Sequence, residues 1–509
     1  MNPLSTAISR SSGVGTSWVC ACPPSRSSDS NRDTWNFSRS TYAAVSPETP
    51  EPTTATVGVD SGCTSRIRSN HAIGLLFVSW VTPPSRRAGG AEYEDTSSAR
   101  KGPAVPDVAP QLAALLSRLI GGELPVGLRA WDGSTAGQDT GPKVVLSSRR
   151  ALRRLLWNPG ELGLARAYVS GDLDVEGDLT EGLRRCWNLF RSGKLRRPQL
   201  GASEWAEIVR LAVRLGVLGP RPAPPPEEAR PTGRLHTRLR DRAVIAHHYD
   251  LGNDFYQLVL DETMAYSCAY FTDPAQSLAD AQRAKLDLVC RRLGLRPGMR
   301  FLDVGCGWGS LLLHAAEHYG VVATGITLSE QQAAHVRAEI TERDLPAEVL
   351  LLDYRDLDDE PYDAIASLEM GEHVGAGNYP RYASTLFRML RPGGRLLLQQ
   401  MSRGEVAPGG GAFIESYIAP DMTMVPIGET LSRLETAGFE IREVRAMREH
   451  YVPTVRAWAE NLEKNADQVP PGWLRVWRLY LAGGALAFEE NRMGVNQILA
   501  AKTTVDGRA

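Results

Sequence analysis

The C-terminal half of the chain alternates short apolar runs with segments whose apolar residues recur at helical spacing. Apolar runs typical of buried strands cover residues 299–304, 321–328, 347–353, 362–369 and 394–401. Helical spacing is found between them, over residues 311–319, 329–343 and 379–390. This alternation predicts an α/β fold with a doubly wound, mostly parallel sheet. Such sheets bind their ligands at the carboxyl ends of the strands.

A smaller set of elements precedes this region. Residues 110–120 have helical spacing, and residues 127–134 and 143–148 are predicted to be strands around a turn. Residues 149–178 are predicted to form two helices separated by a Pro-Gly stop. Helices mixed with short strands indicate a small α+β domain.

Composition divides the chain into four parts. Residues 1–104 are rich in Ser, Thr, Pro and Gly without a sustained period, which indicates a disordered leader or a start codon placed too far upstream. The stretch "GPRPAPPPEEARPTG" predicts a stiff, extended linker. The expected parts are the leader at 1–104, the small N-terminal domain at 105–218, the linker at 219–235 and the large domain at 236–509.

Charge and cysteine content narrow the function classes. The formal net charge of −2 over 509 residues gives no sign of nucleic-acid binding. The seven cysteines have no metal-ligand spacing, so we expect a reduced, cytoplasmic protein without a metal site. No apolar run approaches the roughly 18 to 20 residues that span a bilayer, and we expect only peripheral contact with the inner face of a membrane.

The segment "DLTEGLRRCWNLFRSGKLRRPQ" (178–199) leaves two interpretations open. A basic helix with apolar residues such as Trp187 can lie on anionic lipid. It can equally be an amphipathic helix that packs on its own domain.

A glycine-rich turn, "DVGCGWG" (303–309), joins the first strand of the large domain to a helix. Glycines allow a backbone to approach a ligand closely. The dinucleotide pattern G-x-G-x-x-G is not met, because Ser310 stands at its last glycine, and no Walker lysine is present. In this context the loop indicates S-adenosylmethionine (SAM). The predicted SAM contacts are Asp303, Gly305, Cys306, Gly307 and, at the end of the third strand, Asp353.

The fourth strand ends in "SLEMGEHVG" (367–375), where Glu369 and Glu372 stand three positions apart, with His373 beside the second. By themselves the two carboxylates are consistent with a general acid and base or with polar groups that cap a strand end.

The chain resembles the cyclopropane-fatty-acid synthase family, which includes the mycolic-acid cyclopropane synthases. The stretches that carry the resemblance are "HHYDLGNDFYQLVLDETMAYSCAYF", "AQRAKLDLVCRRL", "FLDVGCGWGS", "GITLSEQQ", "LLDYRD", "EHVG", "FIESYIAP" and "HYVPTVRAWAENL", in order between residues 247 and 462. A further match, "GELGLARAYVSGDLDVEGDL" (160–179), extends it into the small domain.

The resemblance implies a class I, Rossmann-like SAM methyltransferase with a small lipid-binding domain and an acyl tunnel, often a homodimer. It implies transfer of the SAM methyl group to the double bond of an unsaturated membrane phospholipid acyl chain, followed by proton loss and closure of a cyclopropane ring. The SAM contacts that it implies are Tyr266, Ser267, Gly305, Gly307, Thr327, Leu328, Gln332 and Tyr354. A bicarbonate-like ion serves as the base in the family. Its ligands map to Cys268 (through the backbone), Glu372 and Tyr451, with Gln399 and Met401 at two further positions on the fifth strand.

This chain departs from the family at four positions. Gln399 replaces a residue that is often His, Met401 one that is often Ile, and Glu369 one that is often Gly. A cysteine sometimes assigned as catalytic falls at Gly484. We hypothesise that Glu369 supplies the base carboxylate in place of bicarbonate, although the amide of Gln399 could still hold an anion.

The pattern around Glu369 also resembles a branch that makes methylene-branched, 10-methyl-type acids, so both products stay open. More distant alternatives are a small-molecule methyltransferase and a non-catalytic SAM- or lipid-binding protein. The latter predicts a damaged base site, but Glu372 and Tyr451 are both present.

Overall fold

The computed structural model describes residues 107–191, 201–229, 233, 235–238, 240–241, 252–404, 410–504 and 506–507. The predicted leader at 1–104, and His247 and His248 in the first stretch of family resemblance, lie outside these residues. Within the described part, no helix is long and apolar enough to cross a membrane.

The larger of the two sheets is the predicted doubly wound sheet. Its strands are β5 (Arg300–Val304), β6 (Val322–Thr327), β7 (Ala347–Leu351), β8 (Tyr362–Leu368), β9 (Leu390–Ser402), β10 (Glu440–Ala446) and β11 (Gly494–Ala501). They are ordered β10-β11-β9-β8-β5-β6-β7. Strands β5 to β9 pair in parallel. Strand β11 pairs antiparallel with both of its neighbours, β9 and β10. All five predicted strands are therefore confirmed.

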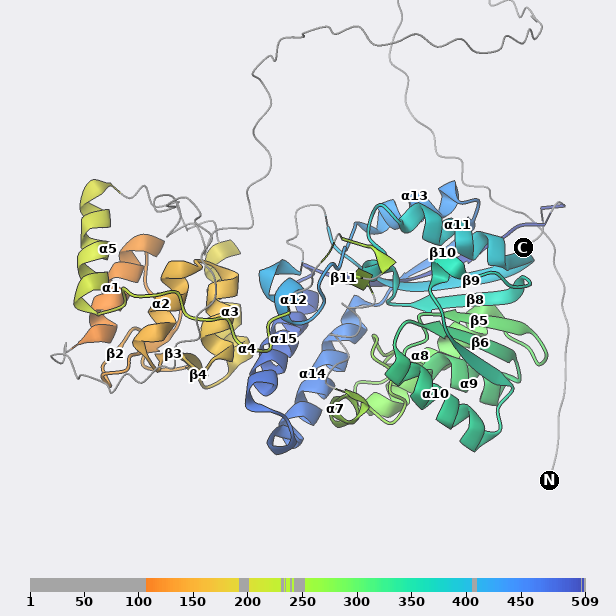
Figure 1. The fold of residues 1–509 in the computed structure, drawn as a ribbon, viewed down its shortest axis with the longest axis horizontal. Helices are drawn as coiled ribbons and strands as arrows, with labels where there is room; N and C mark the ends of the chain where they lie inside the picture. Colours follow the sequence, from red (N-terminus) through yellow and green to blue (C-terminus); the bar gives the residue numbers. More distant parts are fainter. Residues whose placement is uncertain are drawn as a thin grey trace, which may run out of the picture. The chain divides into compact units, whose positions relative to one another are not determined.

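Helices cover both faces of this sheet (Figure 1). One face carries α8 (Leu278–Leu293), α9 (Ser310–Tyr319) and α10 (Glu330–Arg343), and the other carries α11 (Tyr379–Met389) and α13 (Ile427–Thr436). Successive strand residues point to opposite faces. Leu396 and Leu398 accordingly pack in the core with α11, whereas Leu397 packs with α8 and α9.

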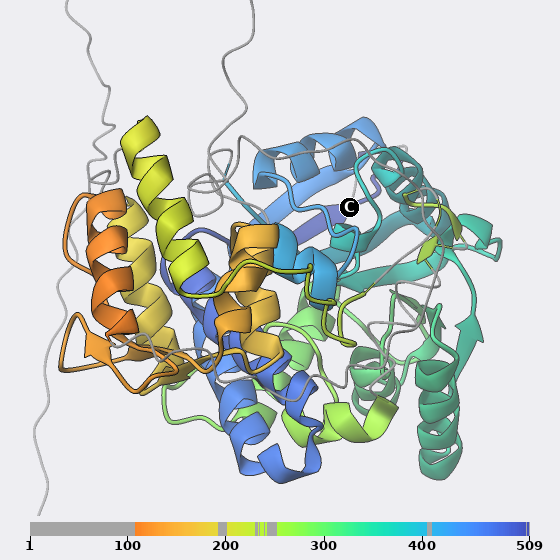
Figure 2. The same ribbon diagram turned by 60° about the vertical axis from the view of Figure 1, so that its left-hand side comes forward.

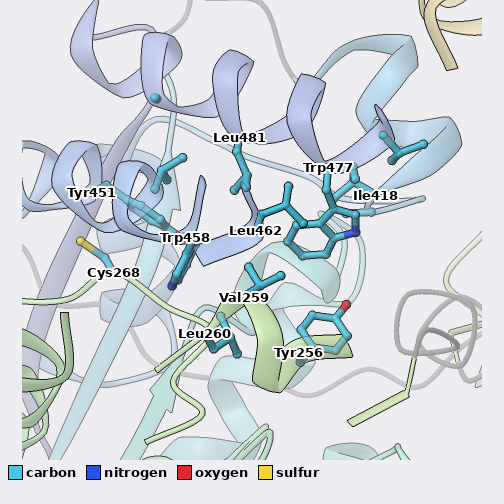
Figure 3. Close-up of a cluster of buried hydrophobic side chains, with 14 of the residues drawn as sticks. Tyr256, Val259, Leu260, Cys268, Ile418, Tyr451, Trp458, Leu462, Trp477 and Leu481 are labelled. Carbon is cyan, nitrogen blue, oxygen red and sulfur yellow. The ribbon is translucent and has the colours of Figure 1, made fainter. Parts of the chain in front are cut away.

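A third core lies beside the sheet. It is formed by α7 (Gly252–Val259), α12 (Gly411–Tyr417), α14 (Arg448–Lys464) and α15 (Pro471–Glu489). Figure 3 shows Trp458 of α14 and Trp477 of α15 directed toward the α7 segment, where Tyr256 is fully buried. The described residues also contain three short 3₁₀ turns: η1 (Tyr354–Asp356), η2 (Gly371–His373) and η3 (Ala466–Gln468).

The small N-terminal region has its own sheet. Its helices are α1 (Val108–Ile120), α2 (Arg149–Trp157), α3 (Glu161–Val169), α4 (Leu179–Arg191) and α5 (Ala202–Arg214). Its strands are β1 (Gly127–Arg129), β2 (Thr135–Ala136), β3 (Lys143–Leu146) and β4 (Leu173–Glu176), ordered β2-β1-β3-β4.

Two local expectations for this region were wrong. Strands β1 and β3 were predicted around a turn, but β1 pairs with β3 in parallel. The turn instead closes β1 onto β2, because Asp132 accepts hydrogen bonds from the backbone and hydroxyl of Ser134. Strand β4 was read as helix, and it forms because Leu173 and Val175 pack in the core of the small region beside β3.

Helix α4 of the small region packs against α15 of the large region. Helix α4 lies against α15 in both views (Figures 1 and 2). Arg184 and Arg191 of α4 pair with Glu489 and Glu490 at 2.8 Å each. The described part of 178–199 thus packs within the molecule, but it packs against α15 of the large region and not on its own domain alone, as the second interpretation had predicted.

Candidate active site

The site forms where the carboxyl ends of three neighbouring parallel strands meet. Strand β8 lies between β5 and β9, with Asp303 opposite Ala366 and Leu368 opposite Gln399. The glycine-rich turn after β5, the Glu369–Glu372 segment after β8 and the end of β9 are therefore adjacent, as the alternating pattern predicted.

The carboxylate of Glu369 is the centre of this site. The backbone N–H of Cys268 donates to Oε1 at 2.9 Å, and the Gln399 side-chain amide donates to the same oxygen at 2.8 Å. The Tyr451 hydroxyl donates to Oε2 at 2.6 Å. Burial raises the pKa of Glu369, and these three hydrogen bonds, with the nearby Lys285 charge, act against that rise because they stabilise the ionised form.

The backbone of Glu369 is held in the left-handed region, with φ of +53°. A non-glycine residue in this region costs about 1–2 kcal/mol. The conformation is maintained by a 2.6 Å hydrogen bond from the Glu369 N–H to the Gln399 carbonyl. Strain of this kind concentrates at functional sites.

A second layer of polar residues orients Gln399. Its side-chain oxygen accepts a 3.0 Å hydrogen bond from Gln497 of β11, whose own oxygen accepts from Arg292 at 2.7 Å. Since that oxygen is occupied, the amide N–H of Gln399 faces Glu369. Gln399 is fully buried, so it acts as a fixed donor.

Glu372 has a different environment, because it is fully buried whereas Glu369 is only partly buried. Its Oε1 accepts a hydrogen bond from the backbone N–H of Met401, while its Oε2 has no hydrogen-bond partner among the described residues. Burial, and then the charge of Glu369, raise the pKa of Glu372 to about 8. Glu369 lines a large cavity that extends from the glycine-rich turn toward the small region, whereas Glu372 does not line it.

Cys268 is placed by its backbone and not by its thiol. The sulfur is fully buried and lies 3.6 Å from the carbonyl of Met447. Burial, and then the Glu369 charge, raise the pKa of the thiol well above its usual range. A thiol that stays protonated is a poor nucleophile, consistent with a positioning role for Cys268.

The glycine-rich turn has the form that a SAM site needs. Gly305 and Gly307 have φ of +78° and +55°, and a Cβ on Gly307 would meet nothing within 4 Å. The turn and the buried Asp303 line the cavity. Burial raises the pKa of Asp303 to about 7, against the nearby charge of Lys285. An open backbone beside an acid fits the amino and carboxylate groups of SAM.

The other predicted SAM contacts fall into two groups. Tyr266, Ser267, Cys306 and their neighbours line the same cavity. The second group does not line it: Thr327, Leu328, Gln332, Asp353 and Tyr354.

Members of the second group make contacts with one another or with neighbouring residues. Gln332 is buried and shares a 2.8 Å hydrogen bond with Thr327, while its amide nitrogen has no partner among the described residues. Asp353, expected near the adenine, pairs with Arg355 at 2.5 Å.

Sequence reasoning missed Lys285. It lies in α8, is 1% exposed, and donates to the Ser267 hydroxyl at 2.9 Å beside Asp303 and Glu369. The available signal was a lysine among apolar residues at helical spacing in "AQRAKLDLVCRRL", a stretch used only for the family resemblance. Gln497 carried no such signal, because its contact with Gln399 joins strands 98 residues apart.

One cavity of about 1850 Å³ connects this site with the small region. Its far part is lined mainly by aliphatic side chains: Leu116, Leu119, Ile120, Leu124, Val126, Val144, Leu164, Val175, Leu179 and Leu183. Pockets for drug-sized ligands measure about 300–1,000 Å³. This cavity is therefore large enough for SAM together with a long apolar molecule.

Comparison with known proteins gives consistent matches. A family model described as mycolic acid cyclopropane synthetase matches residues 236–498. A probable fatty acid methyltransferase of Mycobacterium tuberculosis is 38% identical over 406 residues, 76% of this chain and 93% of that protein. The cyclopropane-fatty-acyl-phospholipid synthase of Escherichia coli is 35% identical over 54% of this chain and 71% of its own length.

Solved structures agree with these sequence matches. The cyclopropane synthase MmaA2 from Mycobacterium tuberculosis is 32% identical, with a TM-score of 0.50. The match covers 53% of this chain and all of MmaA2.

Proposed function

The chain belongs to the mycolic acid cyclopropane synthetase family, and on this premise we propose that it methylates the double bond of an unsaturated phospholipid acyl chain, with Glu369 as the base. The family and the use of SAM, both predicted from the sequence, are confirmed. The acyl substrate, the base and the product are the proposal.

The arrangement around Glu369 carries this proposal. In the family, the backbone of the residue matching Cys268 and the hydroxyl matching Tyr451 hold a bicarbonate-like ion. Here both groups donate to the carboxylate of Glu369 itself. Gln399, at a further ligand position, does the same. A carboxylate attached to the chain thus takes the place of a bound anion, and bicarbonate is not required.

In this reaction the protein has two tasks: to hold SAM and the double bond next to each other, and to accept one proton. Bound SAM supplies an electrophilic methyl group. The electron pair of the double bond forms the new carbon–carbon bond as the methyl–sulfur bond breaks, which leaves a positive charge on the neighbouring acyl carbon. Glu369 accepts one proton from the added carbon, and the freed electron pair closes the three-membered ring.

A methylene-branched product is the second candidate. It requires a hydride shift from the adjacent carbon to the cation before Glu369 takes the proton, so the same base serves both outcomes. The pattern around Glu369, where the family often has glycine, supports it, because that pattern resembles the branch that makes methylene-branched acids.

The cavity supports a lipid substrate. We assign residues 105–218 as a lipid-binding domain, 219–235 as its linker and 236–509 as the catalytic domain. The aliphatic lining of the far part suits an acyl chain, whose transfer from water is favourable by about 0.8 kcal/mol per CH₂. Gly483 and Gly484 of α15 also line the cavity. Gly484 stands where some relatives have a cysteine, so this chain has no thiol at that position.

Product analysis tests the function. The full chain is incubated with SAM and a monounsaturated phospholipid, and the acyl methyl esters are analysed by mass spectrometry with chain fragmentation. A mass gain of one CH₂ is expected, and fragmentation separates a ring from a methylene branch. Absence of SAM turnover with every unsaturated phospholipid tried would refute the proposal.

A pair of variants tests the base. Glu369→Gly removes the carboxylate and relieves the left-handed backbone, and we expect its activity to depend on added bicarbonate. Glu369→Gln fills the same space with an amide, so bicarbonate should not restore it. Glu369→Gly activity that is high and indifferent to bicarbonate would show that the base lies elsewhere.

A further inference from the structure

An apolar and basic face on the small domain is unused by the proposed chemistry. Helix α5 exposes a stripe at helical spacing that includes Val209 and Val213, 53% and 59% exposed. Leu218, after the helix, and Trp157 of α2 are exposed to a similar degree. None of these four residues lines the cavity or belongs to a core cluster.

Trp157 and Leu218 lie together where the chain leaves α5. The Trp157 indole N–H donates to the Gly219 carbonyl at 3.0 Å, which places the ring beside Leu218. The guanidinium of Arg153 donates to the carbonyls of Val217 and Leu218. The segment that leaves α5 therefore runs along α2, and we call α5, Trp157 and Leu218 the α5 face.

The charge of the α5 face is strongly positive. Residues 149–158 and 202–222 contain seven arginines and two glutamates, Glu204 and Glu207, and Glu207 pairs with Arg118 at 2.5 Å. Five of the arginines are exposed: Arg149, Arg150, Arg210, Arg214 and Arg221. Of these five, only Arg150 has an ion pair among the described residues, at 3.7 Å to Asp172. Helix α4 differs, because Arg184, Arg185 and Arg191 all pair with glutamates.

The α5 face is also close to the acyl end of the cavity. Helix α1 contributes Leu116, Leu119 and Ile120 to the cavity lining. The same helix packs against Ile208 on the buried side of α5 through Leu115 and Leu119. A single helix therefore separates the α5 face from the apolar part of the cavity.

We propose that the α5 face docks on a bilayer that contains anionic phospholipids and so brings the acyl end of the cavity to the membrane. Exposed valines and a tryptophan between arginines match the acyl and headgroup layers of such a surface. A second copy of the chain is a poor occupant, because a two-fold interface would set these arginines against their own copies. The choice of a lipid surface rests on the proposed function.

Vesicle binding of the full chain tests the proposal. The variant Val209→Asp/Val213→Asp is compared with wild type by flotation with phosphatidylcholine vesicles, with and without phosphatidylglycerol. We expect wild type to bind only the anionic vesicles and to dissociate as salt is raised. The variant should bind at least about tenfold more weakly, since two apolar contacts are replaced by two like-charged ones.

The matched control is Val322→Asp/Val444→Asp, which alters two exposed valines on the main sheet and should bind as wild type does. Turnover of substrate dispersed in detergent micelles should be retained in both variants, and only the α5 variant should lose turnover on vesicles. Absence of turnover in every protein would count against the proposed function, while flotation would still report on docking.

Three results would overturn the docking proposal. One is equal vesicle binding by wild type and the α5 variant. Another is equal binding of wild type to neutral and anionic vesicles. The third is a lower mass in solution for the α5 variant alone, measured by light scattering, which would show that a second copy covers this face.

Discussion

The two ends of the cavity are built in opposite ways. At the catalytic end a single carboxylate, that of Glu369, accepts three hydrogen bonds of 2.6 to 2.9 Å from groups on three different segments. At the small-domain end the lining is mainly aliphatic, and shape and area take the place of directed contacts.

This contrast indicates how each end should respond to change. A hydrogen bond to a charged group contributes about 1.5–3 kcal/mol and depends on the position of single atoms. Apolar burial is proportional to area and tolerates rearrangement. Changes of one atom should therefore matter at the catalytic end, and changes of volume at the other end.

The largest effect is expected for Glu369→Gln. The amide keeps the size of the side chain but cannot accept the proton, so turnover should fall about 10²–10⁴-fold. The measurement is kcat with SAM and a monounsaturated phospholipid, with the Kd for SAM as a check that the cofactor site is intact. Near-normal turnover would remove the distinction between the two ends.

Tyr451→Phe should have the next largest effect. It removes the 2.6 Å hydrogen bond to Glu369 Oε2, and turnover should fall about 10- to 100-fold. Only the ionised carboxylate is a base, and burial raises its pKa, so wild-type activity should decline on the acid side above the ordinary range of glutamate. Loss of a donor to the ionised form should move this decline to higher pH in the variant.

The control for Tyr451→Phe is Tyr379→Phe. Tyr379 is also buried, but it donates to Gln400 and not to Glu369. This variant should lose some stability and keep the wild-type pH–rate profile. An equal shift of the profile in both variants would contradict a specific role for Tyr451.

A volume change at the apolar side of the cavity should have a moderate effect that depends on the substrate. Gly483 lines the cavity inside α15, and Gly483→Leu would fill space next to Trp187. We expect about tenfold lower kcat/KM for long acyl chains and little change for short ones, with Gly483→Ala as the control. Because leucine favours helix over glycine by about 0.5–1 kcal/mol, the fold should not suffer. A uniform loss over all chain lengths would contradict this assignment of the cavity.

The smallest effect on turnover, but a visible one on stability, is expected for Glu372→Gln. The pKa of Glu372 is raised to about 8 in the folded protein, so the folded state holds a proton that the unfolded state loses near its ordinary pKa. Stability contributed by this proton is present at low pH and is lost as pH rises toward and through 8.

The amide of the Glu372→Gln variant does not titrate, so its Tm should fall less between pH 6 and pH 9 than that of wild type. Thermal unfolding at the two pH values measures this difference. Parallel falls in both proteins would show that Glu372 does not stay protonated in the folded state.

The sequence alone determined the large domain and its cofactor. Strands β5 to β9 and the helices between them follow from apolar runs and helical spacing, because a parallel sheet covered on both faces leaves a strong local pattern. The glycine turn was recognisable because its backbone geometry requires glycine at Gly305 and Gly307.

Local pattern was weaker where strands are short or chain direction matters. Strand β4 and the parallel pairing of β1 with β3 were missed, because four-residue strands have little periodicity and pairing direction is set by distant packing. The basic helix α4 could not be distinguished from a lipid-binding helix until its arginines were seen beside Glu489 and Glu490.

Only the tertiary structure showed how the surroundings of the two glutamates differ. The sequence places two acids three residues apart, and the family resemblance alone assigned Glu372 to an anion site and set Glu369 apart as a substitution. The fold turns Glu369 into the cavity against donors from residues 268, 399 and 451, and turns Glu372 under the end of β9 with one oxygen lacking a partner among the described residues. Their roles differ because the environment of a buried carboxylate, not its identity, decides whether it holds or accepts a proton.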